Sequence, residues 1–236
     1  INSVKLICTP KPTVSSKIVP YVKTWSKNGL NWWKEYNITN LENIYEIEGY
    51  ELNGTACMFT RLSFAYLYNR NIQGELLPEE SWKWKIYQPK SVINGKTLKS
   101  NWLSNVTKNL TWYKPNSDTL FFCKSAKCQL VLESIYGNKF SWIHPQSEVI
   151  GVNYPHFEVL TQHKLTIVLL DNDSTGRVTS TKFCELLNSK NINTKQIFTK
   201  DYKDVSDMVK AIGVKATKDY LDEVISSAIV NSTIPV

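Results

Sequence analysis

The second half of the chain alternates short apolar runs with amphipathic segments. The apolar runs are "TLFFC", "KFSWIH", "KLTIVLLD" and "KQIFT". Helical patterns lie between them at residues 125–136 and 175–190, and a third helix begins in "KDVSDMVKAIG" and ends at Gly213. Strands that alternate with helices assemble into parallel sheets. We therefore predict an α/β fold from Thr119 to Thr199, with a parallel sheet of about four strands flanked by helices.

The first half has a different, mixed pattern. Short helices are expected at residues 31–36 and 41–44, and strand-like runs at residues 45–52, 64–68 and 83–88. The turn signal "KPNSD" follows at residues 114–118. The sequence thus predicts a mixed α+β lobe over residues 1–116, basic and aromatic in character, and the α/β domain over residues 117–236.

Two carboxylates follow the third predicted strand of the α/β domain. Asp171 and Asp173 stand two residues apart, with Gly176 soon after to permit a tight turn. Residues two apart in an extended strand face the same side, so the two charges repel unless a cation lies between them. Oxygen ligands of this kind suit Mg²⁺. The alternative interpretation is a solvated, Asp-rich turn that caps a helix.

Charge and cysteine usage narrow the function classes. The formal net charge of +7 permits a polyanionic partner, and Lys and aromatic residues interleave in "SWKWKIYQPK" and "KTLKSNWLSN". The five Cys are scattered without a Cys-x-x-Cys pair, and the three His complete no metal template. We expect a reduced, cytoplasmic protein without zinc in this chain.

No apolar run approaches the roughly 20 residues of a membrane span, so no membrane partner is expected. Because the chain begins at Ile1, we expect it to be a piece of a longer protein.

The order of these motifs resembles the Toprim domain, the Mg²⁺-binding module shared by bacterial-type primases, topoisomerases and some nucleases. The stretch "KDVSD" after the fourth strand is most similar to primases, and "KSAK" with "PQSE" downstream resembles a phage-type subgroup. In the first half, "WWKEYNITNLENI", "IYQP" and "NWLSN" resemble the amino-terminal lobe of the primase polymerase region. The resemblance covers roughly residues 31–213.

The resemblance implies a set of site residues. Metal ligands for Mg²⁺ or Mn²⁺ would be Asp171, Asp173 and Asp204, with Asp207 as a weaker candidate. Most Toprim domains carry Glu-Gly at the end of the first strand and an Asp a few residues on, whereas this chain has Lys124, Ser125 and Cys128. Lys124 would form a salt bridge to the Asp pair or hold a phosphate. Glu148 would replace the missing carboxylate or lie in a surface loop. The candidate catalytic residues are Lys124, Lys127 and Glu148.

The function that the resemblance implies is DNA primase, a nucleotidyltransferase of a bacterial or phage-infected cell. It would make RNA primers from ribonucleoside triphosphates on a single-stranded DNA template, with a replicative helicase as a further candidate partner. One alternative is a catalytically degenerate module that binds DNA or a helicase, and another is a Toprim nuclease. Of Trp82, Trp84 and Trp102, at least one is expected to face the core. The candidate nucleic-acid-binding residues are Lys83, Lys85, Lys99, Asn101, Trp102 and Asn105.

Overall fold

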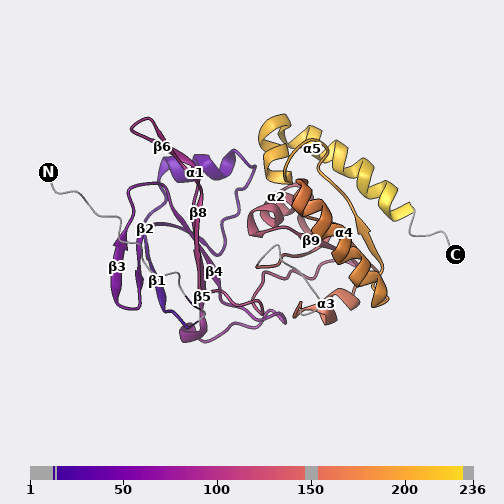
Figure 1. Ribbon diagram of the computed structural model, residues 1–236, viewed down its shortest axis with the longest axis horizontal. Helices are drawn as coiled ribbons and strands as arrows, with labels where there is room; N and C mark the ends of the chain where they lie inside the picture. The colour runs from indigo at the N-terminus through magenta and orange to yellow at the C-terminus, as the bar shows by residue number, and fades with distance from the viewer. Residues whose placement is uncertain (1–12, 14, 147–153, 231–236) are drawn as a thin grey trace. The chain divides into compact units, whose positions relative to one another are not determined.

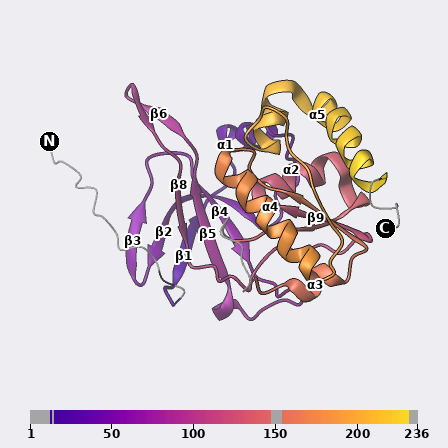
Figure 2. The ribbon, with the colours of Figure 1, turned by 45° about the vertical axis from the view of Figure 1, so that its right-hand side comes forward.

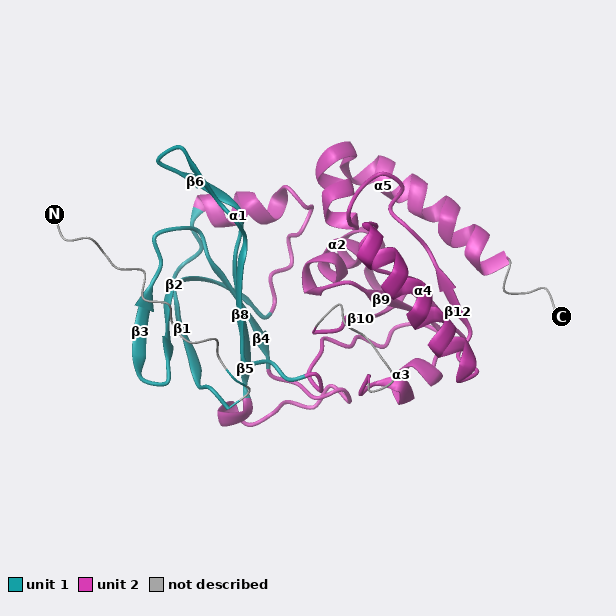
Figure 3. Ribbon diagram, in the orientation of Figure 1, with its two compact units in different colours: residues 1–26, 43–68, 82–107 teal, residues 27–42, 69–81, 108–236 magenta. Residues whose placement is uncertain are grey.

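A computed structural model describes residue 13, residues 15–146 and residues 154–230. The chain forms two compact units, which Figure 3 colours separately. Unit 1 comprises residues 1–26, 43–68 and 82–107, and unit 2 comprises residues 27–42, 69–81 and 108–236. Each unit consists of three separate chain segments, so no single point in the sequence divides the two units. The predicted boundary between residues 116 and 117 stays a prediction.

Unit 1 is built on an antiparallel sheet (Figure 1). Its strands run in the spatial order β1 (Ile18–Val22), β2 (Ile44–Leu52), β4 (Phe64–Tyr68), β5 (Lys83–Gln88) and β8 (Asn101–Ser104), and β3 (Thr55–Met58) pairs with β2. A separate hairpin joins β6 (Ser91–Ile93) to β7 (Lys96–Leu98). The β2–β3 hairpin turns at Asn53 and Gly54, whose φ angles of 50° and 86° match the positive φ that two-residue hairpin turns require.

One face of this sheet forms the core of unit 1. Ile47, Ala65 and Ile86, from three neighbouring strands, are almost fully buried in one cluster, and Trp84 packs against it. Trp84 thus confirms the expectation that at least one of the three tryptophans faces inward. Since side chains alternate along a strand, Lys83 and Lys85 lie on the opposite face from Trp84.

Unit 2 contains the predicted parallel sheet. Four strands pair in parallel in the order β10 (Ser141–Ile143), β9 (Thr119–Cys123), β11 (Leu165–Leu169) and β12 (Thr194–Gln196). The main helices are α2 (Ala126–Tyr136), α4 (Ser174–Ser189) and α5 (Val205–Val230), and the shorter ones are α1 (Lys27–Lys34), α3 (Phe157–Thr161), η1 (Glu79–Ser81) and η2 (Gly137–Lys139). The predicted α/β fold, with its preceding α+β lobe, is confirmed.

Helices cover the parallel sheet because its strands are apolar on both faces. Leu120, Phe122 and Val168 belong to a buried cluster that also takes in Phe183 and Leu187 of α4. Helix α4 packs along β11 and β12 (Figure 2). Phe121 faces the other way and meets Phe140, which in turn contacts Tyr136 at the end of α2, and α2 packs on α5. Burial on both faces is the rule for parallel sheets.

One predicted helix is absent, another continues past its predicted end, and several other bounds shift by a few residues, such as those of α1 and β12. The predicted helix at residues 41–44 is wrong: the chain turns there, with Asn43 at a φ of 61°, and enters β2 at Ile44. Gly213 interrupts α5 with a φ of 80°, after which the chain resumes a helical course to Val230. Within the residues described, no helix has the length and apolar character needed to cross a membrane.

Candidate carboxylate and lysine site

The candidate site forms at the carboxyl ends of three parallel strands, the edge where such sheets bind ligands. The Lys124 amide donates to the Leu169 carbonyl at 3.1 Å, which continues the β9–β11 ladder past both strands. The Asn172 amide donates to the Lys203 carbonyl at 2.7 Å, which draws the segment after β12 to the same edge. These backbone bonds bring the segment of Lys124 together with two acidic segments that are distant in sequence, those of Asp171 and Asp204.

Asp171 is the buried centre of this site. Its side chain is 1% exposed, and its two carboxylate oxygens lie 2.5 and 2.6 Å from Lys124 Nζ. Lys203 Nζ lies 3.3 Å from Asp171 Oδ2. A buried carboxylate needs charge partners to stay ionised, and two ammonium groups supply them here. Of the two roles considered for Lys124, the structure therefore contains the salt bridge.

Asp173 lies at the start of α4 rather than in a strand. Strand β11 ends at Leu169, and Asp173 is the N-cap, accepting a hydrogen bond from the Gly176 amide at 2.9 Å. Its side chain is 45% exposed, and Oδ2 lies 3.2 Å from Lys203 Nζ. The hydrogen bond from the Gly176 N–H lowers the pKa of Asp173 most, burial opposes it, and Lys203 lowers the pKa further, so the pKa is lowered overall. Asp173 is both a helix cap, as the alternative interpretation held, and a partner of Asp171 across Lys203.

A Gly176→Ala substitution is expected to destabilise the protein, because α4 approaches the end of β11 too closely for a side chain. A Cβ on residue 176 would lie 2.2 Å from the Asp171 carbonyl oxygen and 2.7 Å from Asp171 Cβ. Overpacking typically costs about 1–3 kcal/mol, and we expect the upper end because the obstacle is mainly backbone. Urea denaturation measures the loss. The neighbouring exposed variant Thr175→Ala should unfold like the parent, and equal stability of both variants would contradict the close approach.

Asp204 occupies the other side of Lys124. Its Oδ1 accepts the Asp207 amide at 2.9 Å and the Ser206 hydroxyl, which caps α5, and its Oδ2 lies 3.6 Å from Lys124 Nζ. Burial alone would raise the pKa of Asp204, but Lys127, Lys124 and these hydrogen bonds outweigh it, so the pKa is lowered. The Asp207 side chain is exposed.

Lys124 remains protonated despite its burial. Burial alone would lower its pKa, but interactions with Cys128 and Asp204 and the hydrogen bond to Asp171 raise it overall. Burial raises the pKa of the Cys128 thiol to about 12, with Asp204 acting in the same direction. Cys128 is therefore a neutral group at physiological pH. It cannot supply the negative charge of the Asp that the Toprim resemblance leads one to expect near this position.

Lys127 adjoins the site from the first turn of α2. Its Nζ lies 4.3 Å from the ring centroid of Tyr36 and 5.9 Å from that of Trp32, so it packs on aromatic residues at α1. Glu35 pairs with Lys210 of α5 at 2.6 Å beside the same ring of Tyr36. Glu148, the predicted substitute carboxylate, lies outside the described residues.

The arrangement suits one cation at the Asp pair better than a metal cluster. Among residues 15–146 and 154–230, no three His, Cys, Asp or Glu side chains are arranged to hold a metal ion. Nevertheless, oxygens of Asp171 and Asp173 lie 3.3 and 3.2 Å from the same ammonium nitrogen of Lys203. That nitrogen stands in for an ion with two carboxylate ligands, the number that Mg²⁺ commonly takes from a protein. Sequence reasoning missed Lys203, although it directly precedes Asp204 in the "KDVSD" stretch.

Three of the predicted nucleic-acid residues form a basic, aromatic surface on unit 1. The Trp102 ring is 48% exposed and stacks on Tyr87 with centroids 4.1 Å apart. Lys85 Nζ lies 4.9 Å from the centroid of Trp102. Lys83 shares the face of Lys85 on β5. We call Lys83, Lys85 and Trp102, together with the buried Tyr87 on which Trp102 stacks, the aromatic surface.

The other three predicted nucleic-acid residues are placed differently. Lys99 is exposed beyond β7, and Asn101 donates to the Gln88 side chain at 3.3 Å. Asn105 is 2% exposed, accepts the Trp84 amide at 2.8 Å and donates to the Ser16 carbonyl at 2.7 Å. This burial argues against a nucleic-acid contact for Asn105, which instead joins backbone segments of unit 1.

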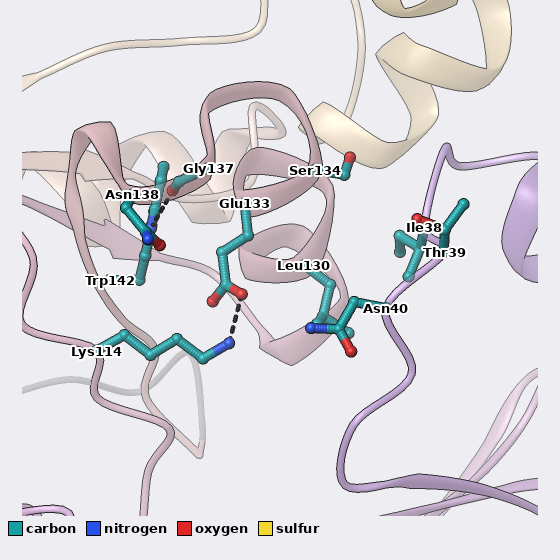
Figure 4. A pocket seen from close by; sticks show the side chains of 10 residues that line it. All are labelled: Ile38, Thr39, Asn40, Lys114, Leu130, Glu133, Ser134, Gly137, Asn138 and Trp142. Atoms are coloured by element: carbon teal, nitrogen blue, oxygen red, sulfur yellow. Dashed lines mark hydrogen bonds and ion pairs between the residues drawn. The ribbon is translucent and has the colours of Figure 1, made fainter.

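A cavity of about 220 Å³ lies elsewhere in unit 2 (Figure 4). It adjoins the segment 38–40 and the second half of α2, and its wall includes the ion pair of Lys114 with Glu133 at 2.6 Å. The carboxylate and lysine site adjoins the first turn of the same helix. The cavity is therefore separate from that site.

Comparison with known proteins identifies the fold. No protein-family model matches the sequence, and no curated protein matches it. Among solved structures, the Aquifex aeolicus primase (zinc-binding and RNA polymerase domains) aligns with a TM-score of 0.55 and 11% identity, over 84% of this chain and 56% of that one. A second match is a chain from a bacteriophage T7 complex, with a TM-score of 0.50 and 10% identity, over 88% of this chain and 91% of that one. In that complex the lagging-strand DNA polymerase interacts with primase domains of two gp4 subunits bound to an RNA/DNA hybrid and dTTP.

These likenesses show that the chain has a primase-type fold, the fold of bacterial and phage primase polymerase regions. At about one residue in ten identical, they show the fold alone. The chain also spans little more than half of the Aquifex structure.

Proposed function

We propose that the chain is the polymerase region of a DNA primase, which joins ribonucleotides on a single-stranded DNA template. The observation that carries the proposal is the convergence of Asp171 and Asp173 on one cation, at the carboxyl edge of a parallel sheet in a primase-type fold. A replicative helicase, fused or bound, is the partner that we propose for a primer-making protein.

The cofactor that we propose is Mg²⁺ or Mn²⁺, held by Asp171 and Asp173. When bound, such an ion would act as a Lewis acid that stabilises the charge developing on the attacking and leaving oxygens. Asp173 is fixed for this task by its capping bond to Gly176, and Asp171 by burial and Lys124. Lys127, beside Asp204, adds positive charge at the same edge, which favours a nucleotide triphosphate.

The aromatic surface is the proposed contact for the DNA template. An exposed Trp ring offers a stacking platform for any base, and nearby lysines attract the phosphate backbone. The stack of Trp102 on Tyr87 and the position of Lys85 over Trp102 hold this platform in place before DNA arrives. Such contacts read no particular sequence, as a template site requires.

A Trp102→Ala variant is expected to bind single-stranded DNA about 5- to 160-fold more weakly, because base stacking is worth roughly 1–3 kcal/mol. Lys85→Ala should weaken binding too and flatten the dependence of affinity on salt by at most about one unit of slope. Fluorescence anisotropy over a salt series measures both effects. The control is Lys182→Ala, which removes an exposed lysine of α4. If Trp102→Ala and Lys85→Ala bind DNA as tightly as the parent and the control do, the DNA contacts another part of the chain.

The second candidate function is a binding module without catalysis. It is favoured by the replacement of the usual Glu and Asp by Lys124 and Cys128, which reduces the negative charge of the site. A nuclease, which normally needs that Glu, is disfavoured by the same replacement. A primase, a binding module and a nuclease would each give a different outcome with single-stranded DNA.

One reaction separates the three candidates. The purified chain is incubated with unprimed single-stranded DNA, labelled ribonucleoside triphosphates and Mg²⁺ or Mn²⁺, and both nucleic acids are resolved on a gel. The primase proposal predicts short labelled oligoribonucleotides and intact template. Cut template would establish the nuclease, and bound but unchanged DNA without oligoribonucleotides would establish the binding module.

A further inference from the structure

We propose that the site takes one divalent ion rather than two. The ion would lie between Asp171 and Asp173 in exchange for the Lys203 ammonium, while Lys124 stays in place as a built-in cation beside Asp204. This inference rests on the metal-binding part of the proposed function, and it specifies the number of ions and the role of each lysine.

The two lysines differ in how firmly the site holds them. The Lys124 side chain is 18% exposed, and its nitrogen lies 2.5 and 2.6 Å from the two oxygens of Asp171. The Lys203 side chain is 53% exposed, and its distances of 3.3 and 3.2 Å to Asp171 and Asp173 are longer. Exposed ion pairs contribute little free energy, whereas a buried charge that loses its partner is strongly penalised. A divalent ion therefore displaces Lys203 and leaves Lys124.

The hydrogen bonds and ion pair of Asp204 also indicate that the divalent ion binds at Asp171 and Asp173 while Lys124 stays beside Asp204. Its Oδ1 is engaged by the Asp207 amide and the Ser206 hydroxyl, and its Oδ2 faces Lys124. A metal ligand at this position would have to give up either the cap of α5 or the interaction with Lys124. Asp173 has no such conflict, because its Oδ1 accepts the Gly176 amide while Oδ2 faces the Lys203 nitrogen.

Charge balance also limits the number of ions. Asp171, Asp173 and Asp204 bring three negative charges to a partly buried edge. Lys124 and one divalent ion already balance these three charges, and Lys127 adds a further positive charge beside Asp204. A second divalent ion would leave an excess of three positive charges while Lys124 and Lys127 remain, and like charges at short range in a site of low dielectric are costly. Lys124 thus fills the place of a second ion electrostatically.

The test counts bound Mn²⁺ by electron paramagnetic resonance, with the purified chain and no nucleotide. We expect one ion per wild-type chain. Asp173→Asn should lower the affinity at least tenfold, whereas Asp204→Asn should leave one ion bound with less than a threefold change; asparagine caps helices as aspartate does, so both helices keep their caps. Lys203→Met should tighten binding up to about fivefold without changing the count, because it removes a competing cation.

Lys124→Glu should raise the count to two, provided that circular dichroism shows it folded; if it does not fold, the matched Asp173 and Asp204 variants still decide. Two ions on the wild-type chain, equal losses in the two Asp variants, or weaker binding by Lys203→Met would overturn the inference. So would primer synthesis by a chain that binds no Mn²⁺, although that result would leave the proposed primase function standing. If the wild-type chain binds one Mn²⁺ and the variants change affinity as expected, the inference is supported even when no primers form. In that case only the proposed primase activity fails.

Discussion

An Asp173→Asn variant is expected to fold like its parent and to lose primer synthesis by at least about 10³-fold. Asparagine is as good an N-cap as aspartate, so the bond from the Gly176 amide and the start of α4 are preserved. The substitution removes the negative charge with which Asp173, together with Asp171, would bind the divalent ion. A metal ion's stabilisation of transition-state charge is worth several kcal/mol, which corresponds to a loss of this size. Steady-state primer synthesis measures it.

The matched control for this substitution is Asp201→Asn, which removes an exposed carboxylate from the loop that carries Lys203 and Asp204. It should retain at least half of the parental rate, since Asp201 takes no part in the contacts of the site described above. Thermal unfolding of both variants establishes that the fold survives. Parental activity in a folded Asp173→Asn variant would remove Asp173 from the catalytic centre.

A Lys124→Met variant is expected to lose about 3–5 kcal/mol of unfolding free energy. Removal of one partner from a buried ion pair leaves an uncompensated charge, with a cost of this order. Asp171 is 1% exposed, and Asp204, on the other side of Lys124, is also buried. Because Lys203 still contacts Asp171, we expect the lower end of the range. Urea denaturation gives the difference, and methionine keeps the apolar volume of the lysine stem.

Lys203→Met is the control for Lys124→Met, because it removes the other ammonium that contacts Asp171. The Lys203 side chain is half-exposed, and exposed ion pairs contribute at most about 1 kcal/mol. Mn²⁺ should restore part of the stability that Lys124→Met loses, since a ligand bound to the native state stabilises it by mass action. Equal losses in the two variants would contradict the distinct roles assigned to the two lysines.

Local patterns in the sequence predicted all four strands of the parallel sheet but only β2, β4 and β5 of the antiparallel sheet, whose strands β1, β3 and β8 were missed. The bounds predicted for β4 and β5 coincide with those observed, Phe64–Tyr68 and Lys83–Gln88, because apolar, aromatic and β-branched residues there favour an extended chain. The parallel sheet followed from the alternation of strands and helices. The helix expected at residues 41–44 failed because four residues carry too weak a periodic signal to distinguish a helix from a turn.

The parts that could not be predicted depend on long-range contacts. Lys203 reaches the Asp pair because the Asn172 amide bonds to the Lys203 carbonyl, a pairing between segments that are distant in sequence. Asn105 was predicted to contact nucleic acid as part of the NWLSN stretch, yet its side-chain amide satisfies two backbone groups inside unit 1. The motif order predicted that Asp171, Asp173 and Asp204 would share one edge, and the structure brings all three to it around Lys124 and Lys203.

The sequence of the product tests the primase proposal most directly. Wild-type chain is incubated with ribonucleoside triphosphates, Mn²⁺ and either of two single-stranded DNA templates of different sequence, and the oligoribonucleotides are sequenced by mass spectrometry. We expect short RNA products that are complementary to the template supplied and that change when the template changes. Oligoribonucleotides that ignore the template, or no product from a folded chain that binds both DNAs, would contradict it.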